Sequence, residues 1–538
     1  MSPVVSVSAA GPRLSYTGTQ VGSVLPIAGA VLGMAIVLAA VLADGSFIAS
    51  GAPVLCVLVA MVWVAPIRVT LCVAMFIGLA ADRPGDSEGR WASPFVSMGG
   101  MMFQNLNKFI SIEALKFSGV FLLVACLLVV RGYRVLSGRA RDTKGSLQPA
   151  APVIWCVVLA VLTIVASVTF GALRGGDLQM AKIQVQAYLQ LLAVAYLFSV
   201  SLRGQRDYRF LAAAIIAAAC VKAVMALWVR SILPPLVSDQ WGVLREMEYA
   251  TNHGDSLLFA CAIAILAGPL FYRPTARHVR GFLLLAPVIV AGIVANDRRI
   301  AWAEVAIVMF VLLAMNRQSL FTRRAARIGI LASPVLLAYA IVGWSSPSRV
   351  FAPVQLVRSL VEAERIDGSI DRSTLFRDVE NFNLAYTFQS NPVLGIGFGH
   401  PFRQLVQGDD LSIFVEYPFL PHNSMLGLWS FTGAAGFTGI FAIIVVTLFL
   451  GARSHAHATS PHHGIAATAA IGCIGSYAIQ LWADIGFSEP PTIFLVGLAI
   501  AVTSQLAVTT GAWPSRWRQY SRVSTSTGMT RKVSWKAE

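Results

Sequence analysis

A single histidine, His422, stands where a polar loop meets a long apolar run, and it is the first candidate for chemistry. A neutral imidazole can take a proton from a hydroxyl near pH 7 without adding a permanent charge, so His422 is the candidate general base. The loop before it carries Gly395, Gly397 and Gly399 in the string GIGFG. Glycines at alternate positions allow positive φ angles, which predicts a tight backbone turn near the histidine.

Arginines supply a second kind of chemistry, because a guanidinium group can clamp two phosphate oxygens at once. The candidates are Arg298 and Arg299 in ANDRRIAW, Arg372 in DRSTLFRDVENF and Arg174 in GALRGGD. We interpret them as binding residues for a diphosphate. A structural role is the alternative, since arginines at helix ends also snorkel, and Glu304 in a neighbouring apolar run needs a partner.

Composition indicates the elements that must position these residues. The 538 residues are 56% hydrophobic and only 12% charged, with a mean hydropathy of +0.70. These values predict an all-α, polytopic membrane protein and argue against a soluble enzyme. About 14 apolar runs approach the length of a bilayer span, centred near residues 32, 55, 74, 123, 161, 194, 220, 264, 288, 308, 337, 437, 474 and 500. The third is short, and a re-entrant segment is its alternative reading.

Basic residues orient the predicted spans. They follow every second apolar run and fill the tail, so the positive-inside rule places these loops and both termini in the cytoplasm. The net charge of +15 is therefore mainly a topological signal, with contact to anionic lipid as a second use. Because the basic residues are scattered over short loops, nucleic acid is not an expected partner. The four candidate arginines fall on the opposite, outer side, and the Arg298 and Arg299 pair there opposes the rule that the rest of the chain obeys.

One outer loop is unusually long. It covers 346–421, between the eleventh and twelfth predicted spans, and contains predicted helices at 353–366 and 371–389. On the second helix, apolar residues recur every three or four positions: Leu375, Phe376, Val379, Phe382 and Tyr386. The predicted organisation is a cytoplasmic segment 1–20, eleven spans in 21–345, the loop 346–421, three spans in 422–510 and a basic cytoplasmic tail 511–538.

Other chemistries lack their residues. All seven cysteines lie in apolar runs without metal-ligand spacing, and no D-x-D or G-x-S-x-G element appears, so neither a metal nor a cofactor is expected. ATP and nucleotide sugars are cytosolic, so an enzyme on the outer face needs a donor with its own leaving group. A lipid diphosphate meets that requirement.

Several of these segments together resemble the O-antigen ligase and O-antigen polymerase superfamily of membrane glycosyltransferases. The resemblance covers about 285–450 and is carried by RIAW, DRSTLFRDVENF and PHNSMLGL with the glycines that follow, although Phe376 stands where tryptophan is common. It implies a protein of the bacterial plasma membrane that moves a polyprenyl-diphosphate-linked glycan onto an acceptor hydroxyl on the outer face. The implied reaction is metal-independent and inverting, with His422 as base and Arg299 and Arg372 at the diphosphate. Whether the acceptor is another lipid-linked glycan, as for a polymerase, or a terminal lipid, as for a ligase, stays open.

Two other classes remain. A flippase or transporter for lipid-linked oligosaccharides would also have about 14 spans, and it would place ionisable residues at membrane depth in paired halves. The apolar runs here are nearly free of charge, with Lys222 and Glu304 as exceptions. A non-catalytic scaffold of a polysaccharide export complex is the third option, and it predicts that no single histidine or arginine matters.

Overall fold

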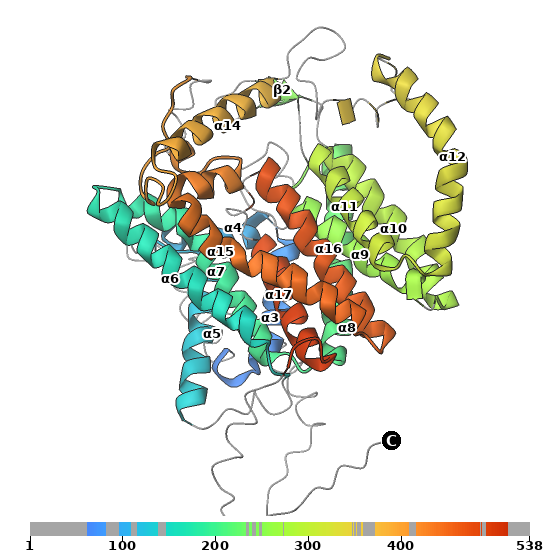
Figure 1. Cartoon of the computed structure of the whole chain (residues 1–538), viewed down its shortest axis with the longest axis horizontal. Helices are drawn as coiled ribbons and strands as arrows, with labels where there is room; N and C mark the ends of the chain where they lie inside the picture. The colour runs from blue at the N-terminus through green and yellow to red at the C-terminus, as the bar shows by residue number, and fades with distance from the viewer. Residues whose placement is uncertain are drawn as a thin grey trace, which may run out of the picture. The chain divides into compact units, whose positions relative to one another are not determined.

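The structure is a computed structural model that describes residues 62–81, 96–108, 116–137, 147–232, 236–238, 244–246, 250–272, 274–346, 348, 351, 354, 357–358, 372–407, 416–484, 486 and 491–514. The chain divides into two compact units, Met1–Ala65 with Asn105–Lys116, and Pro66–Gln104 with Phe117–Glu538. The larger unit contains all of the membrane-length helices described and all of the candidate site (Figure 1).

The described elements are almost entirely helical. The helices are α3 (Ile67–Ala80), α4 (Val96–Phe103), α5 (Gly119–Leu136), α6 (Ala151–Leu173), α7 (Leu178–Ser201), α8 (Gln205–Ile232), α9 (Asp255–Tyr272), α10 (Ala276–Asn296), α11 (Arg299–Met315), α12 (Leu320–Trp344), α14 (Arg372–Ser390), α15 (Ser424–Ala456), α16 (Pro461–Ala483) and α17 (Thr492–Thr509), with 3₁₀ turns η2 (Leu106–Lys108) and η5 (Tyr417–Phe419). Two short strands, β1 (Leu236–Ser238) and β2 (Leu244–Glu246), pair antiparallel.

Ten of the described helices, α5 to α10, α12 and α15 to α17, are long and apolar enough to cross a membrane. The predicted class of helical, multi-pass membrane protein is therefore confirmed. The count of 14 stays a prediction, because the first two predicted spans, the segment 1–20 and most of the tail lie outside the described residues. The third and tenth predicted spans form α3 and α11, of 14 and 17 residues. At 1.5 Å per residue they reach about 21 and 26 Å, short of the roughly 30 Å hydrocarbon core.

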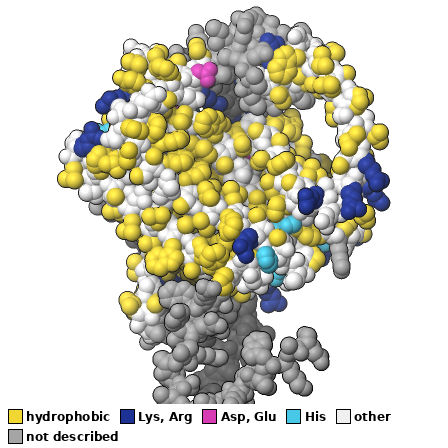
Figure 2. Space-filling view, viewed as in Figure 1, with side chains coloured by type: hydrophobic (Ala, Val, Ile, Leu, Met, Phe, Trp, Pro, Cys, Tyr) yellow, Lys and Arg dark blue, Asp and Glu magenta, His cyan; other side chains and the backbone are white. Residues whose placement is uncertain are grey.

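The most enclosed of these helices is α17, which is buried along nearly its whole length and packs against α7, α15 and α16. At the other extreme, α12 has almost no buried residues, and its main helix contact is with α9. Figure 2 shows hydrophobic side chains over most of the described surface on one face of the molecule. Such a surface is expected where helices contact lipid tails.

Helix α15 is broken within its first turns. Gly433 has φ 63° and ψ −172°, which interrupts the helical ladder. The freed backbone groups are satisfied by the glycine loop, residues 391–399. Ile396 donates its N–H to the Ser430 carbonyl at 3.0 Å, and Ala434 donates to the Pro392 carbonyl at 2.8 Å. The loop and the helix therefore share one set of backbone hydrogen bonds.

Helix α14 confirms the helix predicted at 371–389, whereas the helix predicted at 353–366 lies mostly outside the described residues. None of the five predicted apolar positions of α14 is fully buried, and Phe376 and Val379 are half-buried. Leu375, Phe382 and Tyr386 are exposed, and the buried row is formed by residues at helical spacing that are mainly polar. This row consists of Glu380, Asn383, Leu384 and Thr387.

Candidate functional site

The centre of the candidate site is a carboxylate and imidazole pair between α14 and the start of α15. Glu380 is buried, and its Oε2 lies 3.1 Å from His422 Nδ1. Its other oxygen accepts the backbone N–H groups of His422 at 2.7 Å and Asn423 at 3.2 Å. An ionised carboxylate only accepts hydrogen bonds, so it favours the imidazole tautomer with the proton on Nδ1. The Nε2 lone pair is then free to take a proton.

The surroundings of His422 keep this pair in place. Phe376 meets the imidazole edge-on, with ring centroids 5.7 Å apart, and the Tyr417 ring lies 6.3 Å away. Burial, followed by the charge of Glu380 and a hydrogen bond with it, raises the pKa of Tyr417 well above its usual range, so its hydroxyl stays neutral. The aromatic rings shield the imidazole from water on these sides.

Opposing influences act on the pKa of His422. Burial lowers it, whereas the hydrogen bond and negative charge of Glu380, helped by Asp484, raise it, and the positive charge of Arg377 lowers it again. The net direction is upward from the usual value of 6.5. His422 is therefore a stronger base than a free histidine, but it is available only where the pH exceeds this raised pKa.

A second polar cluster adjoins the first. Asp484, which follows α16, places Oδ2 2.6 Å from His253 Nδ1, and Arg298 Nη1 lies 2.6 Å from the same nitrogen. One ring nitrogen cannot serve both partners at once, because it donates to Asp484 when protonated and accepts from Arg298 when not. Ser424, the first residue of α15, donates its hydroxyl to the Asp484 carbonyl at 3.2 Å. This bond and the effect of Asp484 on His422 connect the two clusters.

Glu304 is the sixth residue of α11, the helix that begins directly after Arg298 of the second cluster. It is completely buried, and neither carboxyl oxygen has a hydrogen-bond partner among the described residues. Arg298 and Asp484 act on it electrostatically. The alternative role of the candidate arginines, as direct partners of Glu304, is therefore not seen among the side chains that the structure describes.

The predicted diphosphate residues have different positions. Arg298 is buried and joins His253 and Asp484. Arg299 is half-buried as the first residue of α11. Arg372 begins α14, about 12 Å along the helix axis before Glu380, and its side chain lies outside the described residues. Arg174 is exposed at the end of α6, with its guanidinium 5.2 Å from the Phe170 ring centroid, and no described contact brings it to His422.

The three loop glycines have the backbone that the sequence predicts. Gly395, Gly397 and Gly399 have φ angles of 68°, 90° and 90°. A Cβ atom on Gly395 would meet the backbone of Phe431, and one on Gly397 would meet the backbone of Gly171. These glycines are thus required by close packing of the loop against α15 and α6.

Gln184 of α7 fastens the end of the glycine loop to the segment before His422. Its Oε1 accepts the Gly399 N–H at 2.6 Å, and its Nε2 donates to the Phe419 carbonyl at 2.9 Å. A cavity of about 20 Å³ lies beside it, enough for about one water molecule. The nearby His400 places Nε2 3.1 Å from the Gly171 carbonyl oxygen, and this contact packs the loop against α6.

Sequence reasoning missed Glu380, Asp484 and Arg377, and gave His253 no role. Glu380 lies in the charged sequence RDVEN, which is typical of a solvent-exposed segment. Its position within the predicted outer helix is the only feature of the sequence that suggests a role in the site. Asp484 had a clearer signal, because it is an acid at the predicted outer end of an otherwise apolar run. Both acids become informative only when the fold brings them to a histidine.

The fold and the site define a multi-pass helical membrane protein with two adjoining carboxylate and histidine clusters at one end of its helices. The chain matches no protein-family model and no curated protein sequence.

Proposed function

We propose that this protein is a glycan transferase of the O-antigen ligase and polymerase type. It would move an oligosaccharide or polysaccharide from a polyprenyl diphosphate to an acceptor hydroxyl at the outer membrane face. The observation that carries the proposal is the Glu380 carboxylate on His422 Nδ1, at 3.1 Å. A carboxylate that orients an imidazole is the arrangement by which enzymes convert a histidine into a directed general base.

In the proposed reaction, His422 Nε2 takes the proton of the acceptor hydroxyl while the hydroxyl oxygen bonds to the anomeric carbon of the donor sugar. The bond from that carbon to the diphosphate oxygen breaks, and the polyprenyl diphosphate leaves as an anion. Glu380 stabilises the imidazolium that forms. Guanidinium groups near the imidazole would stabilise the leaving diphosphate, each by about 3 kcal/mol. Arg377 joins Arg299 and Arg372 as a candidate for this role, because its charge acts on His422.

The test compares His422→Ala with His457→Ala in cells that lack the native gene. His457 is exposed and ends α15 at the opposite end of the helix, so it controls for the loss of a histidine. We expect His422→Ala to abolish glycan transfer, with carrier-bound glycans accumulating by mass spectrometry, whereas His457→Ala restores the wild-type profile. Full transfer by a membrane-inserted His422→Ala variant would contradict the proposal.

A transporter of lipid-linked oligosaccharides is the second candidate, and one observation favours it. Lys222 and Asp255 form a buried ion pair, with Nζ and Oδ2 3.3 Å apart, and Glu304 is a further buried acid. Ionisable side chains inside membrane helices are costly and commonly serve transport. The leaflet in which lipid-linked glycans accumulate distinguishes the two candidate functions. Without the gene, they accumulate on the outer leaflet if transfer is lost, and on the inner leaflet if transport is lost.

A further inference from the structure

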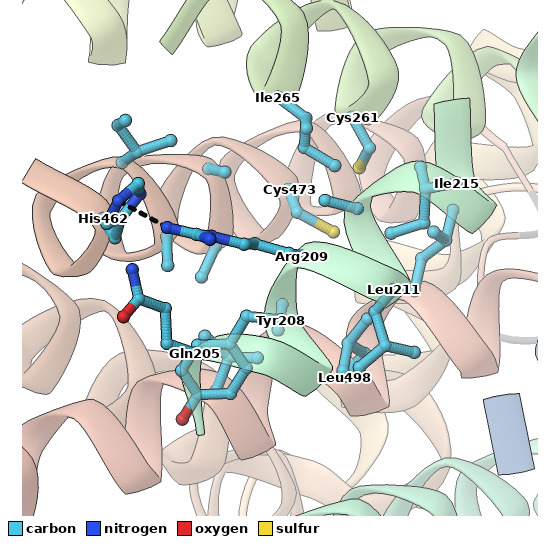
Figure 3. A pocket seen from close by; sticks show the side chains of 18 residues that line it. Gln205, Tyr208, Arg209, Leu211, Ile215, Cys261, Ile265, His462, Cys473 and Leu498 are labelled. Atoms are coloured by element: carbon cyan, nitrogen blue, oxygen red, sulfur yellow. Dashed lines mark hydrogen bonds between the residues drawn. The ribbon is translucent and has the colours of Figure 1, made fainter. Parts of the chain in front are cut away.

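A larger cavity lies outside the candidate site. It has a volume of about 150 Å³ and lies between α8, α9, α16 and α17 (Figure 3). Its residue His462 is in the first turn of α16, whereas Asp484 follows the last turn. These two residues are 22 positions apart, or about 33 Å along a helix. The His462 side of the cavity therefore lies at the opposite end of the helices, which the charge pattern predicts to be cytoplasmic, and the lining extends to Cys473, halfway along α16.

The cavity wall is apolar. Leu211, Ile215, Ile265 and Leu498 line it together with several alanines. A volume of this size accommodates a hydrocarbon of about the size of benzene. The wall thus accepts roughly six carbons of an aliphatic chain and offers little to a polar ligand.

The mouth of the cavity carries a positive charge. In Figure 3, Arg209 extends from α8 towards His462 of α16, and its Nη2 lies 2.7 Å from His462 Nε2. A guanidinium can only donate, so the imidazole nitrogen must accept and be neutral, and the charge of Arg209 is not cancelled. No carboxylate forms an ion pair with Arg209 in the part of the chain that the structure describes. The neighbouring acid, Asp207, is held by Arg68 at 3.1 Å.

We propose that this cavity binds an acidic phospholipid of the cytoplasmic leaflet, with the lipid phosphate on Arg209 and the first part of one acyl chain in the cavity. The exposed guanidinium has donors left for phosphate oxygens, and the apolar wall begins beside it. The cytoplasmic leaflet is rich in anionic headgroups, which are attracted to basic residues near the surface. The proposal is independent of glycan transfer, because the lipid site shares no residue with the His422 site.

The test uses purified full-length protein, stripped of lipid in detergent and titrated with phosphatidylglycerol or phosphatidylcholine under native mass spectrometry. We expect the wild type to retain phosphatidylglycerol in preference to phosphatidylcholine. Arg209→Gln should lower the affinity for phosphatidylglycerol at least tenfold, whereas Arg206→Gln, an exposed arginine on the same helix outside the cavity, should leave it near wild type. Thermal unfolding of each variant checks that the fold is kept.

A second variant tests the apolar wall that is proposed to bind the acyl chain. Ala470→Leu narrows the cavity and leaves its charge unchanged. It should therefore weaken the binding of phosphatidylglycerol but leave the binding of soluble glycerol 3-phosphate unchanged. If Arg209→Gln and Arg206→Gln lose the same affinity for phosphatidylglycerol, the proposal is overturned, because the lipid is then attracted by the general positive charge of the surface. Equal retention of both phospholipids would also overturn it, and so would displacement of phosphatidylglycerol by stoichiometric polyprenyl phosphate, which would assign the site to the carrier.

Discussion

Replacing Glu380 with glutamine tests how the site works as well as where it is. The Glu380→Gln variant would keep the shape of the side chain, and the amide oxygen can still accept the backbone N–H groups of His422 and Asn423. The amide nitrogen, however, would face His422 Nδ1 as a donor. Nδ1 must then accept, which moves the imidazole proton to Nε2 and blocks the atom that should take the acceptor proton.

The expected size of the effect follows from the bond that is lost. A hydrogen bond to a charged group contributes about 1.5–3 kcal/mol. If this free energy is lost from the transition state, transfer slows by roughly ten- to 150-fold. Removing the carboxylate also removes the largest influence that raises the pKa of His422. The activity of the wild type should fall as the pH drops through this raised pKa, and this fall is the acid limb of its pH–activity profile. The acid limb of the Glu380→Gln variant should lie at lower pH than that of the wild type.

The assay measures transfer of carrier-bound glycan in proteoliposomes between about pH 5 and pH 9, with the general-base behaviour read from the acid limb. Asp378→Asn is the matched control, because Asp378 is an exposed acid on the same helix and loses the same charge. The reasoning fails if Glu380→Gln and Asp378→Asn have equal rates and equal pH profiles. A slower Glu380→Gln variant with an unshifted acid limb would leave Glu380 a structural role only.

Three further predictions concern neighbouring residues. Arg377→Gln removes a charge that lowers the pKa of His422, so its acid limb should move to higher pH, opposite to that of Glu380→Gln, in the same assay. Arg298→Gln should cost about 3 kcal/mol of stability, measured by denaturant unfolding in detergent, because it removes the buried cation beside Asp484; an unchanged midpoint would contradict this. Gly433→Ala should destabilise by more than about 1–2 kcal/mol, since its φ of 63° is costly for alanine and its Cβ would meet the Val393 carbonyl, whereas Gly132→Ala, with open space around it, should be neutral or stabilising.

The fold class could be predicted from sequence because apolar runs of membrane length leave few alternatives. The helix α14 was also predictable, but its buried face was not. Leu375, Phe382 and Tyr386 are exposed and Glu380 is buried, because this helix packs a mainly polar row towards the backbone N–H groups at His422. Hydrophobic periodicity identifies a helix face that is buried through apolar residues, and it gives no signal for a face that is buried through polar residues. The role of Asp484 was hidden for another reason, since its partner His253 lies 231 residues away in the chain.

The break in α15 has a consequence for how the protein is assembled. A membrane helix normally completes its own hydrogen bonds as it leaves the insertion machinery, but the turn around Gly433 must wait for partners from the preceding loop. That loop is synthesised before α15, and it must pack against this turn before the backbone hydrogen bonds of the turn are complete. The complete hydrogen bonding of this span therefore depends on residues 391–399, and the helix that they complete begins two residues after His422.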